Sequence, residues 1–363
     1  MSIERREYPD DGLMPELQGT LARKLRPFAR PATSRALWQL ANTVIPFVAL
    51  WSIMAFSRHA GWHYLWTLAL APAAAAFYVR LFILQHDCGH GSFFGSRRAN
   101  QWLGSALGLV TLFPFAYWKK THDVHHATSG DLDRRLLGDI TTLTVAEYRA
   151  LSRWGKFCYR MYRSMPIMLV VGPIYQFVAK HRLPIGMPWR WTREWRSVAL
   201  NNLALVCLVG ALGTWLGWRV LLEVHLPVIS LAGAAGVWLF YVQHTFEGGY
   251  WARGAGWDPQ RAAIAGSSFY DLPPMLRWFT ANIGYHHIHH LAPRIPNYNL
   301  RAAHEATPDL PGLKRLGLRE SLRSARLKLW SEELSCLVDY SILRGAGTVR
   351  GTSACPPPGA PGS

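Results

Sequence analysis

The chain contains 363 residues, of which 50% are hydrophobic and 13% aromatic, and it carries a formal net charge of +17. Its apolar residues fall in long uncharged runs of about 20 residues, the length that crosses the hydrocarbon core of a bilayer. This pattern argues against a water-soluble globular domain. Because the basic residues gather beside the apolar runs, it also favours a membrane surface over nucleic acid as the partner.

The N-terminal part predicts an arm followed by a helical hairpin. Residues 1–35 are basic and interrupted by proline, which indicates a cytoplasmic arm. Residues 36–56 and 62–84 are predicted to be two membrane spans that together return the chain to its starting side. Arg80 is the one charge in the second span, and it lies near an end, where a long side chain can reach the interface.

The middle of the chain contains two weaker apolar segments and a second hairpin. Residues 100–117 are glycine-rich and broken by Pro114, and residues 166–179 are shorter than the ~20 residues that a span needs. Both are expected to lie in the interface or to be re-entrant. Residues 197–217 and 219–243 are predicted to form the third and fourth spans.

The C-terminal part is more polar. Residues 312–345 are expected to form a basic amphipathic helix, and residues 346–363 are proline- and glycine-rich and are expected to be disordered. We therefore divide the chain into the arm, one membrane domain over residues 36–345, and the tail.

Nine of the 15 histidines lie in three short boxes. The boxes are His86-Asp87-Cys88-Gly89-His90, His122-Asp123-Val124-His125-His126 and His286-His287-Ile288-His289-His290. Residues three and four apart share a helix face, so each box predicts a cluster of imidazoles, which are common metal ligands. The face-sharing histidines are His86, His90, His122, His125, His126, His286, His289 and His290. His287 falls off this face and is expected to point elsewhere.

Eight imidazoles exceed the four ligands of a zinc site and suit two metal ions with open positions. Imidazole-rich sites favour zinc, copper, iron or nickel, and a closed structural site remains the alternative. A shared site also constrains topology, because all three boxes must face one compartment. Four spans satisfy this condition, whereas a single crossing by residues 100–117 or 166–179 would separate the boxes.

The boxes and their flanks resemble the membrane fatty acid desaturases, with their HxxxH, HxxHH and HxxHH motifs. The resemblance runs from about Gln85 to Leu300 and includes the four-span pattern. The text around the boxes, such as Gly284-Tyr285 before the third box and Pro296-Asn297-Tyr298 after it, looks like the bacterial acyl-lipid omega-6 (delta-12) branch.

The resemblance implies an all-α integral membrane fold, with four transmembrane helices in two hairpins and a cytoplasmic helical cap that holds a histidine-rich di-metal site. It implies two non-haem iron ions, O2 as co-substrate, and a cis double bond introduced into an acyl chain of a membrane lipid. His244, which ends the last span, is the expected ninth ligand, although an ordinary interfacial histidine is the alternative. The implied location is the bacterial inner membrane, with the boxes and both termini cytoplasmic.

Carboxylates often hold the second nitrogen of a ligating imidazole. The candidates near the boxes and the last span, some of which would be plain surface charges or helix caps, are Asp87, Asp123, Asp131, Asp139 and Glu247.

No haem motif of the His-Pro-Gly-Gly type and no iron–sulfur cysteine spacing occurs, so electrons are expected from a separate carrier such as ferredoxin or cytochrome b5. The basic residues that could dock this carrier are Arg23, Lys24, Arg26, Arg30, Lys119 and Lys120, and ordinary positive-inside charge is the alternative.

Two other functions remain open from the residues alone. Another histidine-box oxygenase, such as a carotenoid ketolase or hydroxylase or a fatty acyl hydroxylase, would begin with the same hydrogen abstraction. A membrane metal carrier or sensor would need a polar path through the bilayer, and the spans contain few polar residues, chiefly Asn42, Asn201 and Asn202.

Overall fold

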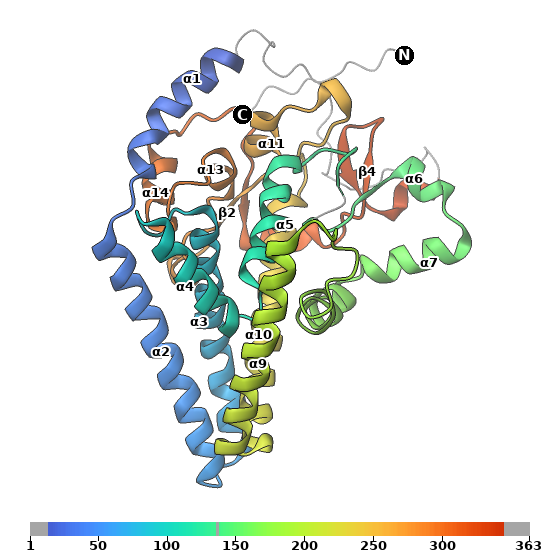
Figure 1. The fold of residues 1–363 in the computed structure, drawn as a ribbon. Coiled ribbons are helices and arrows are strands. Elements are labelled where there is room, and N and C mark those ends of the chain that lie inside the picture. The colour runs from blue at the N-terminus through green and yellow to red at the C-terminus, as the bar shows by residue number, and fades with distance from the viewer. Residues whose placement is uncertain (1–13, 136–137, 345–363) are drawn as a thin grey trace.

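The computed structural model describes residues 14–135 and 138–344. Four of its helices are long and apolar enough to cross a membrane: α2 (Thr33–His59), α3 (Tyr64–His90), α9 (Thr192–Leu216) and α10 (Trp218–His244). They run side by side as a bundle, and most of the remaining elements gather at one end of it as a cap (Figure 1). The fold therefore matches the expected four spans. Each helix begins and ends within a few residues of the range predicted from the sequence.

Helix α3 is the centre of the bundle and leads directly to the first histidine box. It contacts α2 on one side and α10 on the other. Its buried alanines, Ala71, Ala74 and Ala75, are small enough to let the neighbouring helices approach closely. Arg80 is buried rather than reaching an interface, because its guanidinium donates to Thr43 Oγ1 at 3.0 Å and to a carbonyl of the cap.

The second hairpin turns at a position that requires glycine. Gly217 lies between α9 and α10 with φ of 83°, a conformation that residues with a Cβ rarely adopt. The turn keeps α10 antiparallel to α9 and returns the chain to the cap, where α10 ends at His244. The hairpin therefore delivers this histidine to the end of the bundle where the boxes lie.

The two weaker apolar segments form short helices. Residues 100–117 divide into α4 (Arg97–Val110) and α5 (Phe115–Thr128), because the chain bends at Leu112, with φ of 65°, and Pro114 directly precedes the next helix as its N-cap. Residues 167–180 wind as η2 (Ile167–Val171), α8 (Gly172–Ile174) and η3 (Tyr175–Lys180).

The cap is built mainly from short helices. These are α1 (Met14–Leu25), η1 (Arg26–Ala29), α6 (Val145–Ala150), α7 (Arg153–Tyr162), η4 (Gly254–Gly256), α11 (Pro259–Ala265), α12 (Pro274–Phe279), α13 (His286–Leu291), α14 (Asn297–Glu305), α15 (Leu318–Ser324) and η5 (Tyr340–Arg344). Part of the predicted arm belongs to this cap, because Leu21 and Leu25 are buried in a cluster with Ile288 and Leu300.

Two small sheets complete the cap. Strands β1 (Leu143–Thr144), β4 (Leu329–Ser331) and β5 (Cys336–Val338) form one sheet in the order β1-β4-β5. In this sheet β1 and β4 are parallel, and β4 and β5 are antiparallel. Strands β2 (Phe269–Asp271) and β3 (Arg315–Gly317) form the other as a parallel pair.

The expected amphipathic helix over residues 312–345 was therefore wrong, since this segment contains β3, α15, β4, β5 and η5. The reason is visible in β4 and β5, where alternate side chains enter different cores. Leu329 and Val338 pack in a cluster with Tyr148, whereas Trp330 and Leu337 pack with Leu132 and Leu327. This two-residue alternation belongs to a strand, and each cluster includes a residue far away in the sequence, Tyr148 in one and Leu132 in the other. The predicted tail, residues 346–363, lies outside the described residues.

Candidate metal centre

The structure brings the nine expected ligands together at the cap end of the bundle, in two groups. The five-histidine group contains His86, His90, His122, His126 and His289. The four-histidine group contains His125, His244, His286 and His290. Within each group, the candidate ligand nitrogens all lie within 4.8 Å of one another.

The helix geometry explains how the boxes divide between the groups. Histidines four residues apart remain together, as in His86 with His90 and His122 with His126 in the five-histidine group. The member of the second box three residues after its first histidine, His125, turns to the four-histidine group. A pair at i and i+4 is nearly in line along a helix, whereas i+3 is rotated to the other side of that line. Helices α5 and α13 thus each serve both groups.

The third box divides by the same spacing rule, but its i, i+4 pair belongs to the four-histidine group. His286 and His290 are four apart and belong to the four-histidine group, and His289 turns to the other group. His287 lies in neither group. It is fully buried, and its Nε2 lies 3.1 Å from Nδ1 of His304 in α14, so it points away from both groups as the helix-face argument predicts.

The imidazoles face one another through Nε2. In the five-histidine group the Nε2–Nε2 distances are 3.0 Å for His90–His122, 3.1 Å for His122–His126 and 3.0 Å for His126–His289. In the four-histidine group they are 3.1 Å for His125–His244, 2.9 Å for His244–His286 and 3.1 Å for His286–His290.

Burial keeps five of these imidazoles neutral. It lowers their pKa well below the usual value, and the neighbouring imidazoles lower it further. This holds for His122, His126, His286, His289 and His290. A neutral imidazole has a free lone pair on one nitrogen, which is the form that binds a metal ion.

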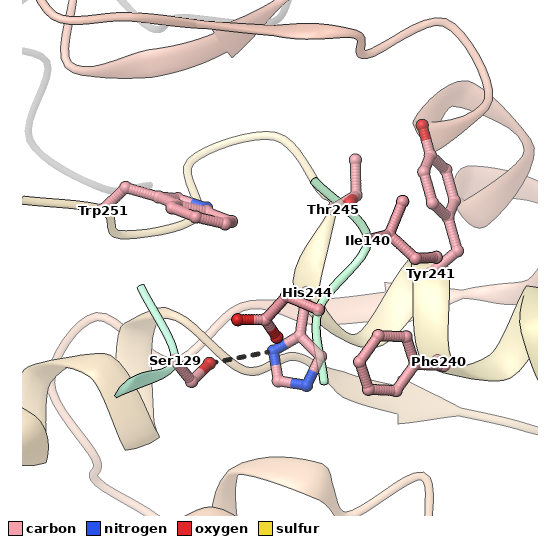
Figure 2. A pocket seen from close by; sticks show the side chains of 8 residues that line it. Ser129, Ile140, Phe240, Tyr241, His244, Thr245 and Trp251 are labelled. Carbon is pink, nitrogen blue, oxygen red and sulfur yellow. Dashed lines mark hydrogen bonds between the residues drawn. The ribbon is translucent and has the colours of Figure 1, made fainter. Parts of the chain in front are cut away.

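In His125 and His244, the hydrogen bonds of Nδ1 show that Nε2 carries a lone pair rather than a proton. Nδ1 of His125 donates to Asp139, and Nδ1 of His244 lies 3.3 Å from the carbonyl of Gly266 and 3.4 Å from Oγ of Ser129 (Figure 2). With the proton on Nδ1, both Nε2 atoms present lone pairs to each other across 3.1 Å. Such a contact is repulsive without a cation, so the donor set fits a bound metal ion.

Asp87 links the first box to two other elements. Its Oδ1 lies 3.5 Å from Nδ1 of His86, and its Oδ2 accepts from the backbone and side-chain nitrogens of Asn297 at 2.7 and 2.8 Å. The Asn297 amide in turn exchanges two hydrogen bonds, of 2.6 and 3.1 Å, with Gln39 of α2. Neither Asn297 nor Gln39 was among the predicted site residues, although a buried amide in an apolar span, such as Gln39, is itself a signal.

The other candidate carboxylates lie elsewhere. Asp123 pairs with Lys119 on the exposed side of α5, because it is one residue beyond His122 and so faces outward. Asp131 binds the backbone nitrogen of Asp133 and the side chain of Arg134. Within residues 14–135 and 138–344, neither these two nor Glu247 makes a hydrogen bond to a histidine.

Known proteins are similar in sequence to most of this chain. Residues 60–320 match the model of the fatty acid desaturase family. A "Fatty acid desaturase" of Bacillus subtilis (strain 168) is 45% identical over 327 residues, which cover 90% of this chain and 92% of that protein. The chain belongs to the fatty acid desaturase family. It is a membrane-bound oxidoreductase, and the alternative of a metal carrier or sensor is set aside.

Further relatives are similar to this desaturase over shorter stretches. A protein of Synechocystis named "sn-1 acyl-lipid omega-3 desaturase (ferredoxin)" is 31% identical over 245 residues, which cover 64% of each chain. An "Omega-6 fatty acid desaturase, chloroplastic" of Arabidopsis thaliana is 25% identical over 260 residues, which cover 67% of this desaturase and 53% of that protein. The family acts on lipid acyl chains with a metal centre and an electron donor, so the same general chemistry holds here.

Proposed function

We propose that this desaturase holds two iron ions in its two histidine groups and uses O2 to introduce a cis double bond into an acyl chain of a membrane lipid. The observation that carries the proposal is the division of nine histidines into groups of five and four, each with its ligand nitrogens within 4.8 Å. Both groups lie at one end of a bundle of apolar helices whose sides would face the lipid of the membrane. An acyl chain can therefore approach the site laterally from the bilayer.

Bound iron would supply the oxidising chemistry that removes one hydrogen atom from each of two adjacent methylenes. O2, the two hydrogen atoms, two donor electrons and two protons give two waters. The residues around the site hold and shield it. Trp118 stacks on His122 with ring centroids 4.9 Å apart, and Phe240 packs on His125 and His244 at 5.1 and 5.3 Å. These rings keep water from the imidazoles. Asp139 fixes the His125 ring so that its Nε2 faces the group.

The proposed position of the double bond is inferred from the amino-acid sequence around the boxes. Its similarity to the omega-6 (delta-12) branch supports desaturation at that position, whereas the Synechocystis relative is named an omega-3 enzyme. We infer omega-6 (delta-12) for this chain.

The test is expression in a host that makes only saturated and monounsaturated acyl chains, followed by mass spectrometry that locates double bonds. We expect a second cis double bond at the omega-6 position. A bond at another position would overturn the regiochemistry alone. An oxygenated product without a new double bond would instead identify a hydroxylase or ketolase.

The metal is tested separately from the product. Purified protein analysed by plasma mass spectrometry should contain about two iron ions per chain, as eight or more imidazoles suit two metals better than one. Zinc alone would contradict the proposal.

The donor and the orientation complete the proposal. A separate carrier such as ferredoxin or cytochrome b5 is supported by the Synechocystis relative, whose name includes ferredoxin. An orientation with the boxes and both termini on the cytoplasmic side of a bacterial inner membrane is supported by the basic flanks of the spans. Reconstituted turnover with each purified carrier would identify the donor.

A further inference from the structure

Helix α7 presents a row of large apolar side chains to its surroundings. Trp154, Phe157 and Met161 are 71%, 51% and 41% exposed. Their spacing of three and four residues places them on one helix face. The rings of Trp154 and Phe157 stack at 5.2 Å, so the row forms a continuous patch rather than scattered contacts. A patch of this kind on an otherwise folded cap indicates an interaction surface.

The opposite face of α7 fixes this orientation. Tyr159 is buried, its hydroxyl donates to the carbonyl of Lys328 at 2.7 Å, and it accepts from the nitrogen of Leu143 at 3.0 Å. Arg160 adds a bond of 2.7 Å to the hydroxyl of Tyr148. The helix is thus tied to the β1-β4-β5 sheet, and it cannot turn its apolar row inward without breaking these bonds.

Basic residues border the apolar row. Arg153 and Lys156 each come one position before an apolar residue of the row, Trp154 and Phe157. At about 100° of rotation per residue, the two rows lie side by side along the helix. Residues 153–162 contain no acidic side chain, so the strip is uniformly positive. An apolar row beside a cationic row is complementary to a surface in which an apolar layer borders a layer of negative charge.

The neighbouring segment continues the apolar surface to the spans. Val170, Ile174 and Val178 are 61%, 54% and 65% exposed and lie four residues apart. This segment packs against α10, where a Cβ on Gly233 would lie 2.7 Å from Pro173. Because α10 is a membrane span, its exposed neighbour lies at the depth of the lipid.

The level of α7 along the bundle agrees with an interface. Figure 1 shows α7 beside the bundle, crosswise to α9 and α10 and near the level where α9 begins. At that end of α9, Trp189 is 83% exposed and stacks on Trp195 with centroids 4.9 Å apart. Exposed tryptophans of this kind are typical of the membrane–water boundary.

We propose that α7 lies in the membrane–water interface, with Trp154, Phe157 and Met161 among the acyl chains and Arg153 and Lys156 binding the phosphates of anionic lipid headgroups. An amphipathic helix of this kind gains affinity from both the buried apolar area and the attraction of basic side chains for anionic lipids. Through Tyr159 the helix holds the small sheet of the cap against the membrane.

The apolar half of the proposal is tested by photocrosslinking in full-length protein, in nanodiscs of phosphatidylcholine and phosphatidylglycerol in equal amounts and in cell membranes. Phe157 is replaced with p-benzoylphenylalanine, and adducts are identified by mass spectrometry. The matched control is Leu334, an exposed apolar residue in the turn between β4 and β5. We expect phospholipid adducts at position 157 and none at position 334. Water-quenched probe at 157, or an adduct with another protein chain, would overturn the proposal.

The cationic half is tested by charge reversal in the same photocrosslinking assay. The double change Arg153→Glu and Lys156→Glu should lower the ratio of phosphatidylglycerol to phosphatidylcholine adducts by about fivefold for each cation removed. The control pair, Arg319→Glu and Arg323→Glu in α15, should leave the ratio unchanged. An unchanged ratio in the α7 variant would refute headgroup binding. Neither readout depends on desaturation, so failure here is separate from failure of the proposed function.

Discussion

At the scale of residues, the spacing within the histidine boxes both brings the imidazoles together and divides them between two groups. Each HxxHH box sends its i, i+4 pair to one group and its remaining histidine to the other, so α5 and α13 each bridge the two groups. His287, adjacent to a candidate ligand, lies off this pattern and bonds to His304. Residues in the same box therefore have different predicted consequences when changed.

Changing His126 or His289 to alanine should abolish desaturation and lower the iron content, because each removes a nitrogen from the five-histidine group. The matched control is His287→Ala, which should retain more activity and most of the iron. Activity, iron per chain and membrane insertion are measured together. Full turnover in the His126 variant would remove that residue from the site, and equal losses at His287 would contradict the helix-face argument.

Asn297→Ala should weaken iron binding without touching a ligand. The change removes the side-chain hydrogen bond to Asp87 and the amide pair with Gln39. Since the backbone bond of residue 297 persists, Asp87 loses one of its two donors. Residues that orient metal ligands typically affect metal affinity about 10- to 100-fold.

The measurement for this variant is iron retained after dialysis against a graded chelator series. Asn299→Ala is the control, because Asn299 lies in the same helix but bonds to the carbonyl of Phe28 and the side chain of Arg35. Equal iron retention in both variants would show that the Asp87 link does not support the centre.

At the scale of elements, the cap is held together by short pieces that are distant in sequence. Helix α6 is an example. Its Glu147 closes a capping box with Thr144 and binds Arg135 of the preceding loop and Arg253 of the segment after α10. Arg253 also pairs with Asp133 and Glu332. One carboxylate thus connects elements on either side of the second hairpin.

This link predicts a pH dependence of stability. Burial raises the pKa of Glu147, but hydrogen bonds from Arg135, the Thr144 nitrogen and Arg253 outweigh it and lower the pKa to about 2 from 4.5. Because the folded pKa lies below the unfolded one, the stabilisation is complete above pH 4.5 and is lost as the pH falls toward 2. Thermal unfolding of Glu147→Gln should therefore differ most from the unmodified protein near neutral pH, and the difference should shrink between these pH values.

At the scale of the whole molecule, the two hairpins place the nine candidate ligand histidines at one end and aromatic turns at the other. Trp62 and Trp66 at the first turn and Trp215 and Trp218 at the second are each at least half exposed. Exposed tryptophans at this distance from the cap mark the opposite interface of a bilayer. The four-span arrangement thus has consistent interfacial residues at both ends.

The topology predicts the sides on which inserted tags appear. An accessible tag between Ser57 and Gly61 should report the side opposite to tags at the two termini, because each hairpin crosses and returns. Protease protection of each tag in inside-out and right-side-out vesicles checks this. Each tag is its own control, because a tag that is protected in one vesicle orientation should be cleaved in the other. Tags at Ser57 and at the termini on the same side would contradict four spans.

The sequence by itself determined the spans and the candidate ligands, because both depend on local spacing. A run of apolar residues is long enough for a bilayer wherever it folds, and an i, i+4 pair of histidines shares a helix face in any helix. The four long apolar helices and the approach of all nine histidines follow these local rules.

The tertiary structure alone decided which histidines form which group and what supports them. Asp87 meets Asn297 across 210 residues, and Gln39 meets Asn297 across 258, so no local pattern reports either contact. The same holds for residues 312–345, where the basic, leucine-rich pattern resembled a helix. Leu329 and Trp330 instead enter clusters supplied by distant segments, and burial of these side chains on both faces of a strand outweighs helix propensity.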